Sequence, residues 1–246
     1  MFVQKIISLV PSQTELLYDL GLNEEVIGIT KFCVHPHIWF KTKTRIGGTK
    51  TINIEKIFSL KPDVVIANKE ENVKEQIEAL QQFTQVYVSD IQNLNDALAM
   101  MIDIGKLVRR EFKAETLVEE IKTKFAALKL STETKIPAAY CIWRNPYMFA
   151  GCDTFINDMM RYCGFTNVFE NEKRYPQISI EKLNQLDCKV LLLSSEPFPF
   201  KQKYIEELQP LLPGIKIMLV DGEMFSWYGS RLLRAADYLK KLMQAI

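Results

Sequence analysis

The sequence predicts an α/β fold of two Rossmann-like lobes with parallel sheets, and three observations lead to it. Short apolar runs alternate with helical patterns in both halves of the chain, as in parallel sheets that helices cover on both faces. A segment that begins at Ile52 returns at Ile178, 126 residues later. A long proline-free run of helical spacing separates the halves. We therefore expect lobes at 1–92 and 131–246, joined by a single long backbone helix over 93–130.

The first lobe is expected to begin with an apolar strand at 6–10 and a helix directly after it. Pro11 opens this helix, Ser12 with Glu15 fits a capping box, and Gly21 ends it. Further strands are predicted at 26–30, 63–67 and 86–88, and further helices at about 53–60 and 71–83.

The middle of the chain carries apolar side chains at a spacing of three and four, which is typical of an amphipathic helix. At about 1.5 Å per residue, a helix over 93–129 would span roughly 50 Å and could form a rigid connection between lobes. A helical hairpin with a turn near Gly105 is the alternative, because glycine weakens a helix by about 1 kcal/mol relative to alanine.

The second lobe repeats this alternation of strands and helices. Strands are predicted at 138–142, 190–194 and 215–220, and helices at 154–162, 180–186, 204–208 and 230–243.

The internal repeat matches 52–57 with 178–183, and each copy precedes an apolar run. It places Glu55 and Glu181 at the starts of equivalent helices and aligns Glu70 with Glu196. Two matched acids on two lobes could form two halves of one docking surface. The alternative is that a generic helix opening recurs by chance.

Composition excludes several classes of protein. Lysine and arginine number 31 against 30 aspartates and glutamates, so no strong field would collect nucleic acid. No apolar run approaches the roughly 20 residues of a membrane span. Five cysteines without a CxxC pair argue against a disulfide framework and a structural zinc site. The sequence shows no export signal at its start.

Ligands of open α/β sheets bind outside the carboxyl ends of the strands, so the segments that follow the strands are candidate sites. These segments are rich in aromatic, thiol and basic groups, which suit a large and partly apolar ligand. They lie at 31–36, 68–71, 143–147, 195–198 and 221–228.

Cys33 and His35 lie two residues apart, so an extended backbone would point both to one side. A thiolate and an imidazole can coordinate a metal within a bound chelate, although ordinary loop packing is the alternative. The pair could also serve a cysteine enzyme, since a thiolate nucleophile needs a nearby base. No serine elbow or phosphate loop accompanies it.

Trp143 and Arg144 end a predicted strand and could together bind the ring edge and a carboxylate of a ligand. The alternative is that the arginine bridges the lobes by a salt bridge. Trp227 and Tyr228 precede the last predicted helix. Both cannot easily be buried beside two glycines, so we expect at least one to face a ligand.

The segments 7–15, 60–67, 163–169 and 221–231 resemble the helical-backbone substrate-binding proteins of metal-chelate ABC importers, and the cobalamin-binding proteins in particular. The resemblance implies a corrinoid in a cleft between the lobes, with haem or a ferric siderophore as alternatives, and no intrinsic cofactor. It also implies a monomer outside the cytoplasm, although a chain that starts here without a signal would stay in the cytoplasm. Glu55 and Glu181 match the family's permease-docking glutamates.

The same resemblance and the segments above give one set of candidate ligand-binding residues. In the family's cobalamin-contacting positions, Phe32 replaces a tyrosine, and Asn68 and Met224 stand where tryptophans occur. The full set is Phe32, Cys33, His35, Asn68, Trp143, Arg144, Tyr147, Glu223, Met224, Phe225, Ser226, Trp227 and Tyr228.

Overall fold

The computed structural model describes residues 5–129 and 135–245, which divide into two compact units. Unit 1 holds the described part of Met1–Ile91 together with Asn95–Glu120 and Tyr228–Arg231. Unit 2 holds Gln92–Leu94, the described part of Ile121–Trp227 and of Leu232–Ile246. The expected start of the second lobe, at 131, lies outside the described residues.

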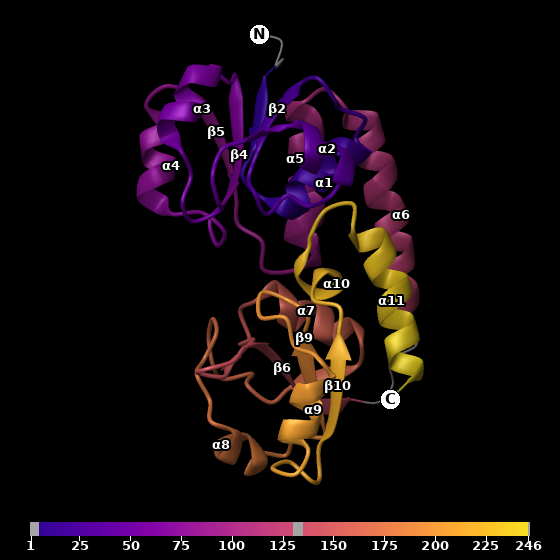
Figure 1. The fold of residues 1–246 in the computed structure, drawn as a ribbon. Helices are drawn as coiled ribbons and strands as arrows, with labels where there is room; N and C mark the ends of the chain where they lie inside the picture. The colour runs from indigo at the N-terminus through magenta and orange to yellow at the C-terminus, as the bar shows by residue number, and fades with distance from the viewer. Residues whose placement is uncertain (1–4, 130–134, 246) are drawn as a thin grey trace. The chain divides into compact units, whose positions relative to one another are not determined.

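Unit 1 contains a five-stranded parallel sheet in the order β3-β2-β1-β4-β5. Its strands are β1 (Ile6–Ser8), β2 (Val26–Ile29), β3 (Thr44–Arg45), β4 (Val64–Asn68) and β5 (Gln85–Ser89). Its early helices are α1 (Pro11–Asp19), α2 (His37–Thr42), α3 (Ile54–Leu60) and α4 (Lys74–Gln81). Helices α3 and α4 cover one face of the sheet, and α1 lies on the other (Figure 1).

The expected capping box of α1 is wrong. Pro11 is the first residue of the helix, which makes Val10 the cap and leaves no side-chain cap at this end. The Glu15 carboxylate instead pairs with Arg231, which is distant in sequence. Each of its two oxygens accepts a hydrogen bond of 2.7 Å from that arginine. The expected end of the helix is confirmed, since Gly21 has a φ of 85°, a left-handed conformation that glycine adopts without strain.

The single long helix expected over 93–130 is interrupted, and the segment forms α5 (Leu94–Leu107) and α6 (Glu111–Lys129). The chain turns at Arg109, whose φ is 56°. Gly105 permits this turn, because a Cβ there would lie 2.4 Å from the Ala114 Cβ of α6. The connecting helix is therefore α6 alone, which runs from unit 1 into unit 2.

Unit 2 contains a sheet in the order β10-β9-β6-β7, with β8 also paired to β6. Strands β8, β9 and β10 run parallel to their neighbours, and only β7 is antiparallel to β6. The strands are β6 (Ile136–Trp143), β7 (Met148–Phe149), β8 (Phe165–Asn167), β9 (Val190–Ser194) and β10 (Lys216–Val220). The helices are α7 (Phe155–Tyr162), α8 (Ile180–Asn184), α9 (Gln202–Leu208), α10 (Glu223–Ser226) and α11 (Leu232–Gln244).

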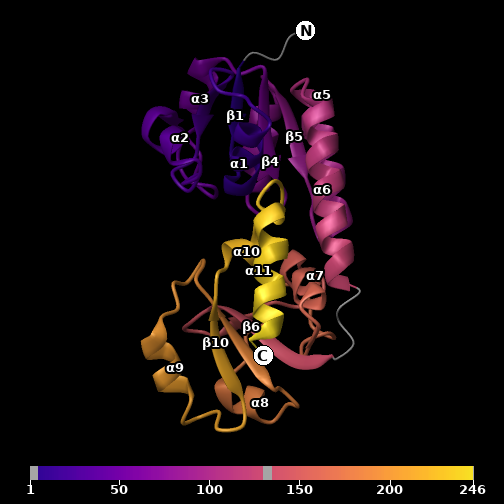
Figure 2. The same cartoon turned by 90° about the vertical axis from the view of Figure 1, so that its right-hand side faces the viewer.

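Helix α11 lies alongside the C-terminal part of α6 within unit 2 (Figure 2). Lys124 of α6 joins the two helices by donating to the Asp237 carboxylate at 2.6 Å and to the Leu233 carbonyl at 3.3 Å. The C-terminal helix thus supports the helix that connects the two units.

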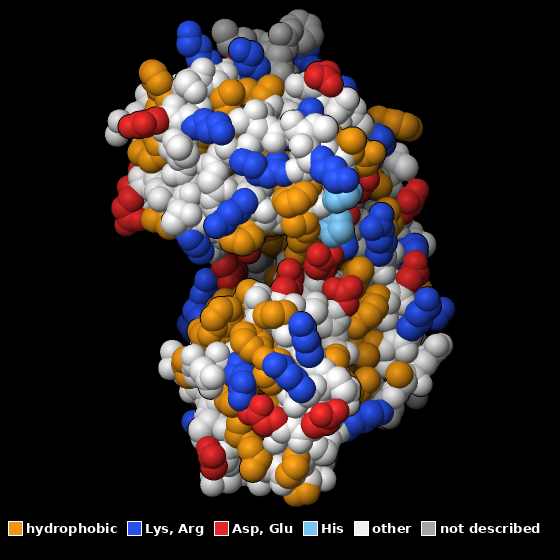
Figure 3. Space-filling view, viewed as in Figure 1, with side chains coloured by type: hydrophobic (Ala, Val, Ile, Leu, Met, Phe, Trp, Pro, Cys, Tyr) orange, Lys and Arg blue, Asp and Glu red, His pale blue; other side chains and the backbone are white. Residues whose placement is uncertain are grey.

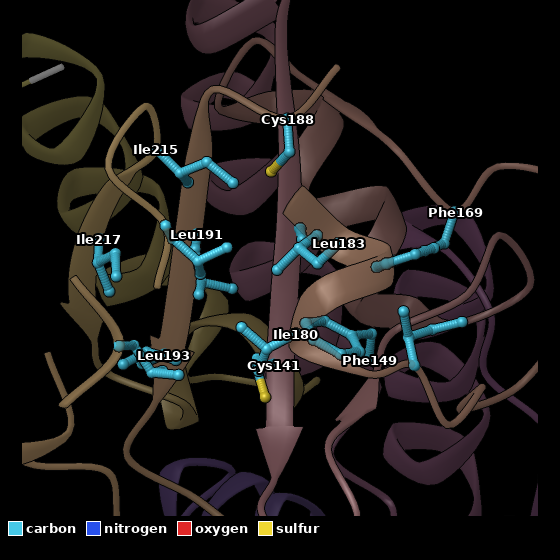
Figure 4. Close-up of a cluster of buried hydrophobic side chains, with 14 of the residues drawn as sticks. Cys141, Phe149, Phe169, Ile180, Leu183, Cys188, Leu191, Leu193, Ile215 and Ile217 are labelled. Atoms are coloured by element: carbon cyan, nitrogen blue, oxygen red, sulfur yellow. The ribbon is translucent and has the colours of Figure 1, made fainter. Parts of the chain in front are cut away.

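The apolar positions of the repeated sequence face the core of unit 2 on the α8 side. Ile180 and Leu183 of α8 point into a cluster with Cys141 of β6 and Leu191 and Leu193 of β9 (Figure 4). Each fully buried side chain of this size contributes roughly 1.5–3 kcal/mol. Because strand residues alternate between faces, Tyr140 points to the opposite face and packs against Phe225 of α10.

The repeat is a helix–strand module present in each unit. Asn53 caps α3 by accepting from the Lys56 amide, and Ser179 caps α8 by accepting from the Lys182 amide. The strands that follow, β4 and β9, are buried throughout and keep the same offset. The structure thus gives Glu55 and Glu181 the same place, in the first turn of matched helices.

Candidate functional site

The loop after β2 exposes apolar side chains at the carboxyl edge of the unit 1 sheet. Phe32 is 50% exposed and Val34 38% exposed, while His35 is half-buried. Figure 3 shows histidine side chains at the surface with hydrophobic side chains beside them. This part of the predicted site is accessible to a ligand.

Cys33 lies inside unit 1 instead of beside His35 at the surface. It is fully buried, and its sulfur lies 3.1 Å from the Thr14 hydroxyl and 3.2 Å from that of Thr30. Burial raises the pKa of the thiol, which keeps it protonated. The geometry therefore argues against Cys33 as a ligand contact, a metal ligand or a nucleophile, and it leaves a Cys33–His35 enzyme without its thiolate.

Asn68 ends β4 and is part of a neutral network at the same edge. Its side-chain amide donates to Ser89 at the end of β5, and its carbonyl oxygen accepts from the backbone amides of Glu70 and Glu71. Gln13 of α1 donates to the same Ser89 hydroxyl at 2.5 Å. Asn68 is 2% exposed, so its first role is to hold the turn after β4 in place.

The carboxyl edge of unit 2 contains a half-buried acid, Glu196, in the corresponding turn. Glu196 accepts a bond of 2.6 Å from the Ser226 hydroxyl and one of 2.9 Å from the Trp227 indole. Burial raises the pKa of Glu196, the two donors lower it, and the nearby charges of Glu223 and Asp221 raise it further. Its carboxyl group therefore takes up a proton more readily than an exposed glutamate does.

Gly222 is required by this arrangement. A Cβ at this position would lie 2.5 Å from both the Glu196 Cγ and the Ser194 Oγ. The loop after β10 can approach the loop after β9 this closely only where the side chain is a hydrogen atom.

The predicted residues at 223–228 separate into core and surface groups. Phe225 is fully buried between Tyr140 and Tyr238, and Trp227 and Tyr228 are each 7% exposed. The expectation that Trp227 or Tyr228 faces a ligand is therefore not supported by their burial. Glu223, Met224 and Ser226 are half-buried, so they remain accessible in part.

Trp143 is 39% exposed at the end of β6, where its ring meets Phe198 at a centroid distance of 5.8 Å. It is the exposed aromatic counterpart, in unit 2, of Phe32 in unit 1. Both side chains offer the flat apolar surface that a large ring system needs.

Arg144 forms an ion pair with Glu207 of α9 within unit 2. Its Nε donates to the Tyr147 hydroxyl at 3.4 Å, and its guanidinium carbon lies 5.0 Å from the centre of the Tyr204 ring. Arg144 and Tyr147 thereby line a pocket of about 450 Å³, which also includes Glu181. No sequence signal marked Glu207 as part of a site, because it lies within a helix and outside the repeat.

Glu55 and Glu181 are exposed in the first turn of α3 and α8, respectively. Hydrogen bonds from its own backbone amide and from Ser179 lower the pKa of Glu181 below its ordinary value. On α3, Phe58 lies three residues after Glu55 and therefore on the same helix face. Phe58 is 60% exposed and meets Phe83 edge to face at 5.1 Å.

Within residues 5–129 and 135–245, no group of three or more histidine, cysteine, aspartate or glutamate side chains is arranged to hold a metal ion. In the same part of the chain, no helix has the length and apolar character needed to cross a membrane.

The model of the periplasmic binding protein family matches residues 6–210. The chain belongs to this family. A vitamin B12-binding protein from Vibrio vulnificus is 30% identical over 74% of this chain and 67% of its own length. Another from Pectobacterium carotovorum is 25% identical over 99% of this chain and 89% of its own length. The expected resemblance to helical-backbone substrate-binding proteins of the cobalamin-binding type is thus confirmed.

Solved structures agree with this fold. The periplasmic vitamin B12-binding protein of Vibrio cholerae superposes with a TM-score of 0.85 at 21% identity, covering 100% of this chain and 98% of that one. A periplasmic haem-binding protein in complex with two haems gives the same TM-score at 17% identity, with 98% of each chain covered. The α/β fold of two lobes with a connecting helix is confirmed.

Proposed function

We propose that this protein is a non-catalytic receptor that binds a corrinoid of the cobalamin class and delivers it to an ABC importer. The observation that carries the proposal is the similarity of nearly the whole chain to vitamin B12-binding proteins. The exposed aromatic side chains Phe32 and Trp143, at the carboxyl edges of the two sheets, support it, because they suit a large, flat and partly apolar ligand.

Cyanocobalamin titration of the purified protein tests this function. Trp143 is the tryptophan with the largest exposed fraction, so we expect its fluorescence to be quenched on binding. A Trp143→Phe variant should still bind, as judged by equilibrium dialysis, but should lose most of the quenching. Absence of binding at micromolar cyanocobalamin would overturn the corrinoid proposal.

Haem or a ferric siderophore is the second candidate. The similarity of the fold to a haem-binding protein and the half-buried His35 at the edge of unit 1 favour it. An imidazole can serve as an axial ligand of haem iron. Haem should then give a Soret band that shifts in His35→Ala, while Cys33→Ala leaves it unchanged. An identical band in wild type and His35→Ala would remove His35 from the proposal.

The importer role further proposes that Glu55 and Glu181 dock a membrane permease and that the protein works outside the cytoplasm. Charge pairs of this kind set orientation and association rate more than affinity. Glu55→Arg and Glu181→Arg should each reduce uptake of labelled cyanocobalamin by cells and leave its affinity for the purified protein unchanged. Altered ligand affinity would assign the glutamates to the ligand site instead, and cell fractionation tests the location.

A further inference from the structure

One stretch of unit 1 carries basic charge without any acid. No aspartate or glutamate occurs between Glu25 and Glu55, although acids and bases are almost equal in number over the whole chain. The stretch includes β2, helix α2 and the edge strand β3, so its charge collects at one edge of the sheet. It contains both histidines of the chain and five other basic residues, namely Lys31, Lys41, Lys43, Arg45 and Lys50.

Ion pairs do not compensate these five cations in the part of the chain that the structure describes. Lys43 donates to the Asn23 carbonyl at 2.7 Å, and Arg45 donates to the Lys43 carbonyl at 2.9 Å. Glu25, an acid near Lys43, is paired with Arg110 instead. This edge of unit 1 therefore attracts anions.

Aromatic rings hold several of the basic side chains on one face. The Lys43 ammonium lies 5.4 Å from the centre of the Trp39 ring, and the Arg45 guanidinium carbon lies 4.5 Å from that of Phe40. Tyr18 of α1 meets Trp39 edge to face at 5.3 Å. Figure 3 shows basic, histidine and hydrophobic side chains together on the part of unit 1 where Figure 1 labels α2. The surface termed the α2 face below consists of Tyr18, Ile38, Phe40, Lys41, Lys43 and Arg45.

The α2 face also exposes apolar surface among its charges. Ile38 is 57% exposed, and Tyr18 is 42% exposed. Lys41 is exposed and lies three residues after Ile38, on the same side of α2. This combination suits the surface of a bilayer, where basic side chains meet phosphates, tyrosine rings lie at the interface and aliphatic side chains reach the acyl chains.

The spread of the cations favours an extended anionic surface over a single small anion. Lys43 contacts Asn23, which precedes β2, whereas Lys31 follows β2. A strand rises about 3.3 Å per residue, so these two cations lie near opposite ends of a strand roughly 10 Å long. A nucleic acid is also extended, but an aliphatic side chain such as Ile38 cannot stack on its bases as an aromatic ring does.

We propose that the α2 face binds the surface of an anionic phospholipid bilayer. Lys41, Lys43 and Arg45 contact the lipid phosphates, and Ile38 inserts between the headgroups. The attraction acts over a short range, because salt at 0.1 M screens charges beyond about 10 Å and the chain as a whole is nearly neutral. The inference goes beyond the proposed function, since it requires neither a corrinoid nor a permease.

Sedimentation with phospholipid vesicles tests the lipid. Vesicles made of equal parts phosphatidylglycerol and phosphatidylcholine should bind the protein about tenfold more tightly than vesicles of phosphatidylcholine alone. Sodium chloride at about 0.5 M should remove this preference, because the attraction depends on charge. Equal binding to both kinds of vesicle, or a preference that persists in high salt, would overturn the proposal.

Two exposed lysines of unit 1 locate the binding surface. Lys41→Glu should weaken binding to the anionic vesicles about fivefold or more, the equivalent of about 1 kcal/mol for each basic side chain at the surface. Lys106→Glu makes the same charge change on α5, which contacts the opposite edge strand, β5, through Asp103 and Tyr87. This control should bind as wild type does. Equal losses in the two variants would show that net charge alone matters and would overturn the proposal.

Ile38→Ser tests the insertion of an apolar side chain. The substituted residue is exposed, so the fold should be retained, and circular dichroism checks this. The variant should bind the anionic vesicles about threefold or more weakly than wild type, because less apolar area is buried in the bilayer. Wild-type binding would rule out the insertion and, with it, the choice of a bilayer over another polyanion.

Soluble anions distinguish the bilayer from other partners. Neither glycerol phosphate nor single-stranded DNA, at the same phosphate concentration as the lipid, should release the protein from anionic vesicles. Release by glycerol phosphate would assign the α2 face to a free phosphate, and release by DNA would assign it to a nucleic acid. Either result would overturn the proposal.

Cyanocobalamin affinity separates this inference from the proposed function. Lys41→Glu and Ile38→Ser should bind cyanocobalamin as wild type does, and a loss in either variant would place the α2 face in the ligand site and contradict the inference. If wild type binds no cyanocobalamin while the vesicle results hold, the corrinoid function fails and the bilayer-binding face stands.

Discussion

Units 1 and 2 each hold a glutamate close to the carboxyl edge of the sheet, buried in unit 1 and half-buried in unit 2, and the two are stabilised differently. In unit 1, Glu15 receives two hydrogen bonds from a buried arginine, Arg231. In unit 2, Glu196 receives only neutral donors, from Ser226 and Trp227, and has acids nearby. The ion pair of Glu15 connects two segments that are distant in sequence. Glu196 has only neutral donors, and its raised pKa makes it easier to protonate.

The pairing in unit 1 has a structural consequence. Arg231 belongs to the short segment Tyr228–Arg231, which is part of unit 1 although the chain on either side belongs to unit 2. Gly229 of this segment, with a φ of 105°, packs against Ser12 and Leu16 of α1. The ion pair therefore holds the segment Tyr228–Arg231 against α1. In unit 2, Glu196 has no ion pair of this kind.

The largest effect should follow from removing the cation in unit 1. Arg231→Ala leaves the Glu15 carboxylate buried without its charged partner, which should lower the free energy of unfolding by about 3–5 kcal/mol. Urea unfolding followed by circular dichroism measures this. Lys69→Ala is the control, because it breaks the exposed pair with Asp90 and should cost less than about 1 kcal/mol. Similar losses in both variants would show that the buried ion pair contributes no more to stability than the exposed one.

A methyl group at Gly222 should disturb the acid of unit 2. Gly222→Ala forces a Cβ against Glu196 and Ser194 and should destabilise the protein by about 1–3 kcal/mol. Gly214→Ala provides the matched control, since a Cβ there meets no atom within 4 Å. Unfolding midpoints of the two variants check the difference, and a neutral Gly222→Ala would mean that the loop after β10 can move away freely.

Two exposed phenylalanines of unit 1 can be compared, one at the carboxyl edge of the sheet and one on helix α3. Phe32→Ala should reduce cyanocobalamin affinity about two- to twelvefold, the range expected for an aromatic contact of about 0.5–1.5 kcal/mol. Phe58→Ala, an exposed phenylalanine on α3, should leave the affinity unchanged. Isothermal titration calorimetry measures both, and equal effects would place the ligand elsewhere than at the carboxyl edge of unit 1.

The smallest expected effect is a pH dependence from Glu196. Its pKa in the folded protein is raised above the ordinary value of 4.5, so the folded state holds this proton more tightly than the unfolded state does. Its stabilising contribution is therefore present below pH 4.5 and is lost as the pH rises through the folded pKa. Glu196→Gln should remove that part of the stability profile.

Ser226→Ala should shift the same transition to higher pH, because it removes a donor that favours the charged form. Free energies of unfolding measured from pH 4 to 8 test both variants. A Glu196→Gln profile parallel to that of wild type would exclude Glu196 as the titrating group.

The fold followed largely from local sequence. Continuous apolar runs in the sequence predicted buried strands such as β4 and β9. Gly21 follows the end of α1, as expected. The short strands β3, β7 and β8 were not predicted, because two or three residues carry too little pattern. The break between α5 and α6 was expected only as the alternative, a turn near Gly105, since the apolar spacing continues across Arg109 while the backbone turns there.

The candidate site was predicted less completely. The predicted segments do follow parallel strands in the structure, at the edge of a sheet where ligands of such folds bind. It could not tell an exposed side chain such as Phe32 from a buried one such as Phe225, since both lie in loops or short helices without periodicity. Cys33 was a candidate ligand contact because of its spacing to His35, with loop packing as the alternative, but it is buried and its sulfur contacts the hydroxyl groups of Thr14 and Thr30.

The sequence by itself determined the family, the repeated helix–strand module and the matched positions of Glu55 and Glu181, because these depend on residues close together in the chain. Only the tertiary structure decided which partner each polar side chain has. Glu15 meets Arg231, Glu196 meets Trp227, and Arg144 meets Glu207 across separations that no local pattern encodes. Such contacts form only once the sheets bring distant loops together, so they became visible only in the folded chain.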